Sequence, residues 1–309
     1  MIKILVLAWL AMMSLVAQAQ QKIVVLNAQG IGYSGSPQFL AVLDEANSMQ
    51  KKYQFVPEFK IGGFESVALR EVKSKPNTYI STVVTTHLEA ADRGLISLDD
   101  YVPLYSIGDA CWSLAANFGD EKSGLNSLNG PDAPKEIVVG APALGGALHL
   151  TALEIGEKYK KPVRFIFYKT NSEAVIAMLQ GDINVTMDRV RVYQDYKSKF
   201  PNISILASSC GQRHPDAPHV KTLAEQKIIV PPIFNVIVAS KDMDAPRRKE
   251  IKDIFRQATL NIGTKKLPAL GDHWPAVFQN RDDEEYYYSM VKRHQELRKK
   301  WNSEVDKFR

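Results

Sequence analysis

The stretch Val138–Leu150, VVGAPALGGALHL, decides the fold predicted for this 309-residue chain. An apolar run stops there at a turn containing Gly145 and Gly146, and a helical pattern begins at Ala147. Glycine adopts a positive φ without a Cβ clash, and the first amides of a helix carry a partial positive charge. Such a turn between a strand and a helix suits an anion.

A second turn of similar character lies far upstream, at Asn27–Ser36, after the apolar run Lys22–Leu26. Ser36 and Pro37 fit the N-cap and the first position of a helix. Two such turns that face each other would form a clamp for a small acid.

The order of strand, turn and helix recurs along the chain. Further strands are predicted at Tyr53–Phe59, Tyr79–Val84, Arg164–Tyr168, Ile183–Met187 and Ile203–Ser208. Further helices are predicted at Ser66–Ser74, Ser172–Gln180, Val190–Ser198 and Pro246–Ile262. This alternation predicts an α/β fold with mainly parallel sheets.

Two later segments bear on the division into lobes. The apolar run Ile228–Ala239 contains two prolines and is interpreted as a crossover between two lobes. Asp282–Phe308 predicts a long, charged helix, which we expect on the surface of the first lobe.

The composition is that of a globular protein, with 45% hydrophobic and 24% charged residues. Its formal net charge is +5, and the charged residues are spread along the chain instead of forming blocks. This distribution gives no indication of nucleic-acid binding.

Met1–Ala19 has the pattern of a secretory signal peptide. Lys3 supplies the charged region, Ile4–Val16 the apolar region, and Ala17–Ala19 a cleavage site with small residues. We therefore expect export to the periplasm, with a mature chain that begins at Gln20. Since an exported chain meets an oxidising compartment, Cys111 and Cys210 are candidates for one disulfide, which the sequence leaves open.

Enzyme signatures are weak. Gly30, Gly32 and Gly35 fit the G-x-G-x-x-G pattern of dinucleotide sites, but an exported chain leaves the cytosolic nicotinamide pool. His214 and His219 lie in a proline-rich loop without a metal-ligand pattern, and no G-x-S-x-G elbow is present. We predict no catalysis, no cofactor and no metal site, and keep a dinucleotide-dependent enzyme as the less favoured alternative.

Three segments together resemble a known family. They are VGAPALGGALHL at 139–150, FIFYKTNSEAVIAMLQGDINVTMD at 165–188, and RHPDAPHVKTLAE at 213–225. Their order and spacing are similar to those in the substrate-binding proteins of tripartite tricarboxylate transporters, the Bug or TctC-like receptors. This resemblance spans nearly the whole mature chain.

The resemblance implies a periplasmic-binding-protein type II fold, α/β, with two lobes joined by crossover strands. Each lobe holds a mainly parallel sheet flanked by helices. Lobe one is expected at residues 20–104 plus 237–309, and lobe two at 105–236. The lobes would close on a small carboxylate, which a monomeric receptor passes to membrane permease subunits. An exported sensor that signals to a membrane partner is the alternative.

The ligand-binding residues implied by the resemblance lie in one loop of each lobe. The first loop supplies Gln29, Gly30, Ile31, Tyr33 and Ser34, and the second supplies Ala143, Gly145, Gly146 and Ala147. Tyr168 and Asp188 are added because they lie at the ends of predicted strands. The family's first-loop Asp is missing, so a plain carboxylate is favoured over an amino acid.

Overall fold

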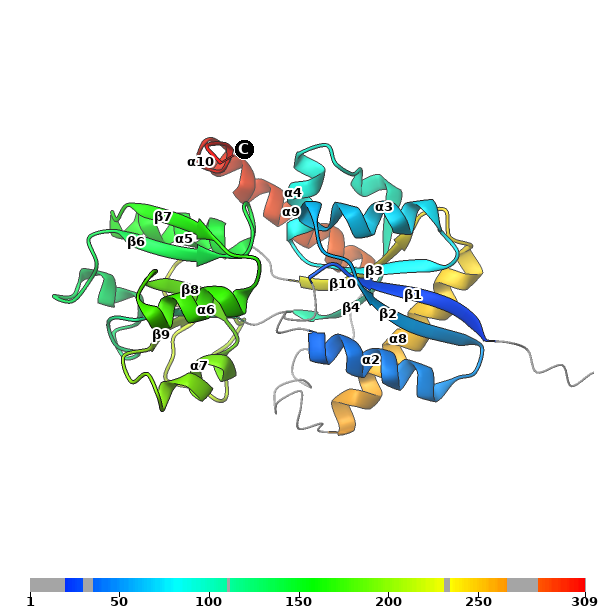
Figure 1. Ribbon diagram of the computed structural model, residues 1–309, viewed down its shortest axis with the longest axis horizontal. Coiled ribbons are helices and arrows are strands. Elements are labelled where there is room, and N and C mark those ends of the chain that lie inside the picture. The colour runs from blue at the N-terminus through cyan, green and yellow to red at the C-terminus, as the bar shows by residue number, and fades with distance from the viewer. Residues whose placement is uncertain (1–19, 30–35, 110–111, 231–233, 266–282, 309) are drawn as a thin grey trace, which may run out of the picture.

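The computed structural model describes residues 20–29, 36–109, 112–230, 234–265 and 283–308, which form two lobes (Figure 1). The first lobe contains a five-stranded sheet of order β2-β1-β3-β10-β4. Its strands are β1 (Gln21–Asn27), β2 (Tyr53–Phe59), β3 (Tyr79–Val83), β4 (Tyr101–Asp109) and β10 (Phe234–Ser240). Strand β10 is antiparallel to both of its neighbours, and the other four strands run in one direction.

The second lobe repeats this arrangement with a sheet of order β7-β6-β8-β5-β9. Its strands are β5 (Ser113–Ala116), β6 (Ile137–Ala141), β7 (Val163–Phe167), β8 (Val185–Asp188) and β9 (Ser204–Ser208). Here β5 is the one strand that runs against the others. The predicted α/β class with mainly parallel sheets is therefore confirmed, with one antiparallel strand in each sheet.

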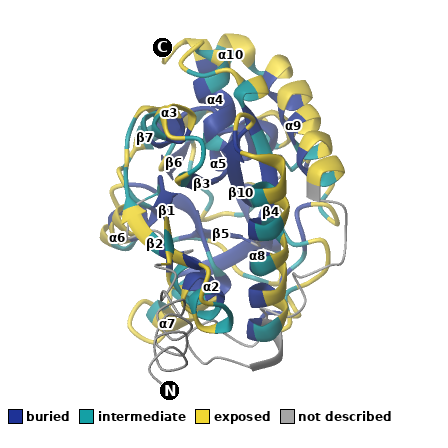
Figure 2. Ribbon diagram, turned by 90° about the vertical axis from the view of Figure 1, so that its right-hand side faces the viewer, coloured by how far each residue is buried: buried dark blue, intermediate teal, exposed yellow. Residues whose placement is uncertain are grey.

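Helices cover both faces of the first sheet because alternate residues of its strands point to opposite sides. Ile23 and Val25 of β1 pack against α2 (Ser36–Met49) and α8 (Ala245–Lys265). Val24 and Leu26 belong to a second cluster. That cluster includes residues of α3 (Ser66–Ser74), α4 (Thr86–Asp92) and α9 (Asp283–Lys300). Figure 2 shows buried strands between helices whose outer faces are exposed.

The second sheet is covered in the same way. Helix α5 (Ala147–Tyr159) packs on one face, together with a 3-10 helix at Gly124–Asn129. Helices α6 (Asn171–Gln180) and α7 (Val190–Lys197) contribute to the cluster on the other face. Part of the connection between β5 and β6 is thus buried, because Leu125 and Leu128 enter the core.

The C-terminal segment departs from its prediction. Tyr287 and Val291 of α9 pack in the core of the first lobe, as expected. Leu297, however, packs in the core of the second lobe, as does Val305 of α10 (Asn302–Asp306). Figure 1 shows α9 and α10 running from one lobe toward the other. The sequence predicted a long, charged helix on the first lobe, and its additional contact with the second lobe was not predicted.

The chain crosses between the two sheets twice. The chain leaves the first sheet after β4, enters the second sheet at β5, and returns at β10. Leu104 lies within β4 and Val236 within β10, so both predicted boundary positions fall inside long strands. Cys210 is disulfide-bonded; Cys111, the other cysteine of the sequence, lies outside the described residues, as does the predicted signal peptide.

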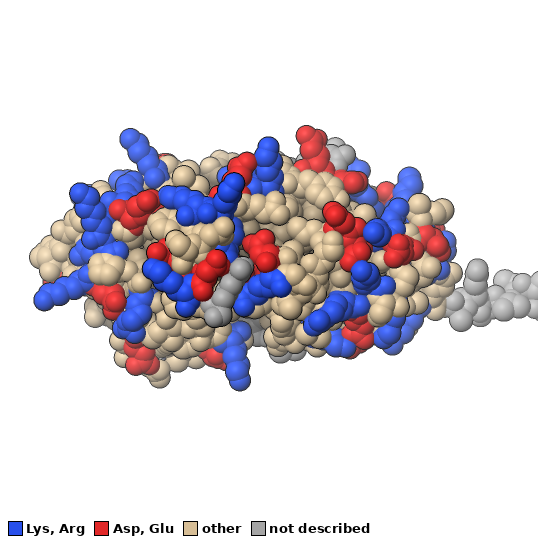
Figure 3. All heavy atoms as spheres, turned by 90° about the horizontal axis from the view of Figure 1, so that it is seen from above, with Lys and Arg blue, Asp and Glu red and all other residues tan. Residues whose placement is uncertain are grey.

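Positive and negative side chains are mixed on the surface, as they are along the sequence (Figure 3). Figure 3 shows Lys and Arg side chains interspersed with Asp and Glu over the displayed face. Among the described residues, no helix is long and apolar enough to cross a membrane.

Close packing around Gly140 of β6 can be tested by substitution. A Cβ added to Gly140 would lie 2.2 Å from Ile183 Cδ1 and 3.1 Å from Ala174 Cβ. We expect Gly140→Ala to lower the free energy of unfolding by about 1–3 kcal/mol through overpacking, measured by urea denaturation. Gly211→Ala is the control, because nothing lies within 4 Å of its added Cβ. Equal stability of the two variants would contradict the packing argument.

Candidate functional site

A cavity of about 560 Å³ lies between the two lobes. The first lobe lines it with residues 28–29, 61–65 and 84–86, and the second lobe with Trp112, Met187 and residues 142–143, 146–148, 169–171 and 173. Most of these segments directly follow β1, β2, β3, β6 and β7. The carboxyl ends of parallel strands are where open α/β sheets bind ligands, so this cavity is the candidate ligand site.

The segment Val138–Leu150 forms one wall of the cavity. Strand β6 ends at Ala141 and helix α5 begins at Ala147, as the sequence predicted. Gly146 is the N-cap residue of α5, and no side chain caps this end of the helix. Because Ala147 and Leu148 line the cavity, the positive end of the α5 dipole is directed at it.

Gly145 shapes this turn. Its φ is +70°, in the left-handed region that favours glycine. Its amide N–H donates to Nδ1 of the buried His149 over 2.9 Å, so that amide is already satisfied in this structure. Burial and the nearby Arg298 guanidinium lower the pKa of His149 to about 3, which keeps the imidazole neutral and able to accept.

The same turn contacts the first lobe through Glu89. A Cβ on Gly145 would lie 2.5 Å from Glu89 Oε2. Glu89 is buried and accepts hydrogen bonds from Arg93 Nε at 2.7 Å and Arg298 Nε at 3.2 Å. This buried pair joins α4 of the first lobe to the C-terminal helix beside the second-lobe turn.

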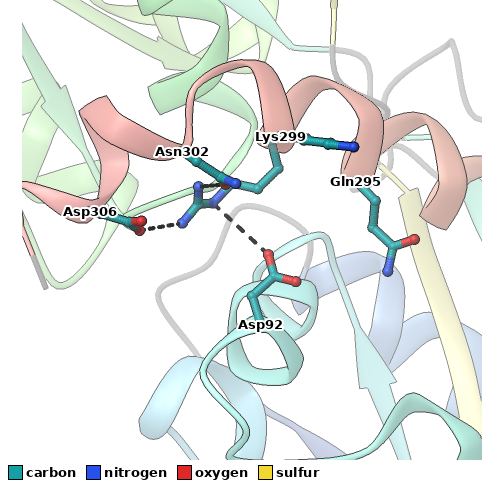
Figure 4. A pocket seen from close by; sticks show the side chains of 6 residues that line it. Asp92, Gln295, Lys299, Asn302 and Asp306 are labelled. Atoms are coloured by element: carbon teal, nitrogen blue, oxygen red, sulfur yellow. Dashed lines mark hydrogen bonds and ion pairs between the residues drawn. The ribbon is translucent and has the colours of Figure 1, made fainter.

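Arg298 makes further contacts on α9 and α10. Its guanidinium donates to Asn302 Oδ1 and to Asp306 Oδ1, the latter over 3.1 Å, and its Nε lies 3.9 Å from Asp92 Oδ2. Figure 4 shows these side chains around a smaller polar cavity of about 330 Å³. Arg298 pairs with both acidic residues that line this cavity, so the cavity is part of the junction between α4 and the C-terminal helices.

Glu65 forms the opposite wall of the main cavity. Its side chain is buried, and Oε1 accepts hydrogen bonds from Gln29 Nε2 and Thr86 Oγ1. Oε2 lies 3.2 Å from the Val84 amide nitrogen, which donates to it. Burial outweighs these three neutral donors and raises the pKa of Glu65 to about 8.

An unusual backbone holds Glu65 in this position. Gly62 and Gly63 have positive φ, and so do Phe64 at 54° and Glu65 at 73°. For residues other than glycine this region is disfavoured by about 1–3 kcal/mol, and such strain clusters at ligand sites. The segment between β2 and α3 therefore presents Glu65 to the cavity at a conformational cost.

The predicted site residues fall into three groups. Those that line the cavity are Gln29, Ala143, Gly146 and Ala147. Those that are described but do not line it are Gly145, Tyr168 and Asp188. Those outside the described residues are Gly30, Ile31, Tyr33 and Ser34, together with the glycines of the alternative dinucleotide motif.

Several cavity residues were missed by the sequence reasoning. Glu65, Thr86, Lys169 and Asn171 all line the cavity. The available signal was the glycine pair at 62–63, which follows a predicted strand in the same way as the other two glycine turns. Within the described part of the chain, no group of three or more His, Cys, Asp or Glu residues is placed to hold a metal ion.

The comparisons with known proteins concern the fold. No protein-family model and no curated protein matches the sequence. Solved structures do match. A TctC solute-binding protein from Polaromonas is 18% identical, with a TM-score of 0.65 over 91% of this chain and 98% of that one. The fold is that of a TctC-type solute-binding protein.

Two further matches have named ligands. MatC from Rhodopseudomonas palustris with bound malate is 14% identical, with a TM-score of 0.66 over 92% of this chain and 98% of that one. An R. palustris protein with adipate is also 14% identical, with a TM-score of 0.72 over 90% of this chain and 96% of that one. The two-lobed type II fold predicted from the resemblance is thus confirmed.

A matched pair of variants tests the second-lobe turn. Gly145→Ala would combine a positive φ with a contact to Glu89, and we expect it to lower the free energy of unfolding by about 1–3 kcal/mol. At Gly146 the φ is −72° and the nearest atoms are 3.4 Å from an added Cβ, so Gly146→Ala should change stability by less than about 1 kcal/mol. Urea denaturation measures both. A smaller effect at Gly145 than at Gly146 would refute this account of the turn.

The pKa of Glu65 gives stability a defined pH dependence. Because it rises from 4.5 to about 8 on folding, the folded protein keeps a proton that the unfolded chain releases between these values. The contribution of Glu65 to stability should therefore fall as pH rises through this window, by up to about 1.4 kcal/mol per pH unit. Glu65→Gln should remove most of the fall in stability that urea denaturation measures between about pH 7.5 and 8.5.

The lower limit of that range avoids the buried histidines. Burial lowers the pKa values of His87, His149 and His294 from 6.5 to about 4, 3 and 3, so their opposite effect on stability has largely ended by about pH 7.5, where the unfolded imidazoles are mostly neutral. Glu304→Gln, at a surface pair with Lys307, is the control and should retain the wild-type slope. A Glu65→Gln slope identical to that of the control would mean that Glu65 is ionised in the folded protein.

Proposed function

We propose that this chain is a periplasmic receptor of the Bug or TctC-like family, which captures a small carboxylate between its lobes. It would deliver this solute, as a monomer, to the membrane subunits of a tripartite tricarboxylate-type transporter, and would catalyse no reaction. Malate and adipate are the ligands named for two structures of the same fold, and both are small dicarboxylates. They support the ligand class proposed here.

The observation that carries the proposal is the uncapped N-terminus of α5 at the cavity. Its first amides form a preorganised site for a carboxylate, and their attraction for the anion is stronger where water is excluded. Lys169, at the end of β7, also lines the cavity and adds a positive charge from the same lobe. Gln29 and Thr86 supply neutral polar groups from the first lobe, so a ligand would contact both lobes only when they are close together.

Lys169 offers a direct test by isothermal titration calorimetry with adipate and malate. Wild-type protein should bind at least one of them. Lys169→Gln should weaken binding about three- to tenfold, and less in high salt, because Lys169 is exposed and its charge is screened.

The matched control is Lys122→Gln, which alters an exposed lysine away from the cavity and should bind like wild type. A panel of carboxylates, amino acids and nicotinamide dinucleotides covers the competing ligand classes. Stabilisation by dinucleotides alone, with no response to any carboxylate, would overturn the receptor proposal.

A further inference from the structure

The feature that the proposed function leaves unused is Glu65, an acidic side chain in the wall of a site proposed for an anion. Only 3% of the residue is exposed to solvent. Its three described donors, Gln29 Nε2, Thr86 Oγ1 and the Val84 N–H, are all neutral. A buried carboxylate without a positive partner is strongly disfavoured, whereas a carboxylic acid is not.

The groups around Glu65 in its own lobe do not supply a counter-charge. On α4, His87 is buried and its Nε2 lies 2.8 Å from the Tyr287 hydroxyl of α9. Burial lowers the pKa of His87 to about 4, so the imidazole is neutral at physiological pH. Burial raises the pKa of Tyr287, so that phenol is neutral as well.

The nearby cations are engaged elsewhere or lie at the exposed edge. Arg93 forms an ion pair with Glu89 at 2.7 Å. Lys169 and Glu173, from the second lobe, line the same cavity but are exposed. Among the described residues, none of these groups forms an ion pair with Glu65.

We propose that Glu65 is a specificity-determining residue that meets the ligand as an uncharged acid and donates a hydrogen bond to one of its carboxylate oxygens. This inference rests on the proposed function. Oε2 is the donor atom, because it accepts a hydrogen bond from the Val84 N–H alone, while Oε1 accepts from Gln29, Thr86 and, at 3.4 Å, the same Val84 N–H. The occupied site thus holds a carboxylate together with a proton on Glu65.

This arrangement makes affinity depend on pH in one direction. Below pH 8 the Glu65 acid is already protonated, since its pKa is about 8, and binding needs no additional proton. Above pH 8 the empty site loses that proton and must regain it when a carboxylate binds, because two adjacent negative charges repel. The dissociation constant should then rise by up to about tenfold per pH unit.

The test is calorimetry with adipate and malate between about pH 6.5 and 9, in two buffers of different ionisation enthalpy. Wild-type protein should show constant affinity at the acid end and a weakening above pH 8. The buffer dependence of the heat near pH 8.5 should reveal uptake of roughly half to one proton per ligand. Both ligands are fully ionised over this range, so the proton must come to the protein.

The variant Glu65→Gln keeps an uncharged donor of the same size. It should bind within about threefold of wild type at pH 6.5 and keep that affinity to pH 9, without proton uptake. Glu304→Gln, which alters a surface pair far along the chain, should follow the wild-type curve. Should Glu65→Gln fail to fold, proton uptake by the wild-type protein decides the question alone.

The outcomes separate the two proposals. Carboxylate binding that is independent of pH and buffer in both proteins would overturn the role of Glu65 and leave the receptor function standing. Binding of a cationic diamine that strengthens above pH 8 would show Glu65 acting as a carboxylate, and would also overturn the inference. Failure of every carboxylate to bind wild-type protein at any pH would remove the proposed function and this inference with it.

Discussion

The buried ion pair between Glu89 and Arg298 is the interaction on which the geometry of the site depends. Their side chains are 1% and 3% exposed, so neither charge is stable without the other. Additional partners, Arg93 on one side and Asp306 on the other, offset the desolvation of the pair. Because Glu89 also lies against Gly145, this one contact fixes α4, the C-terminal helices and the second-lobe turn relative to one another.

The structure of the segment Val138–Leu150 was predictable because neighbouring residues in the sequence determine it. A β-branched run, a proline, two glycines and a helical pattern specify β6, the turn and α5 without reference to the rest of the chain. Gly145 does take the positive φ that the glycine pair suggested, and Gly146 occupies the N-cap position of α5 without a capping side chain. The hydrogen bond from the Gly145 amide to His149 Nδ1 was not predictable, because it depends on how the His149 side chain packs.

The remaining half of the site depends on contacts between distant segments. Glu65, Thr86 and Gln29 meet only because β1 pairs with β2 and β3, which brings three loops to one edge of the sheet. The left-handed φ of Glu65 contradicts its residue type and could not be inferred from propensity. The C-terminal segment shows the same limit, since its helical pattern predicted a helix on the first lobe but not the contact that Leu297 and Val305 make with the second.

The two walls of the cavity have opposite electrostatic character. The α5 N-terminus attracts an anion, whereas an ionised Glu65 in contact with that anion would repel it, by about 4 kcal/mol for two charges about 4 Å apart at an effective dielectric constant near 20. A proton on Glu65 removes this repulsion, and burial already favours that proton at neutral pH. The acidic wall is therefore compatible with a carboxylate ligand only as a neutral acid, which ties the chemistry of the site to the strained backbone that places Glu65 there.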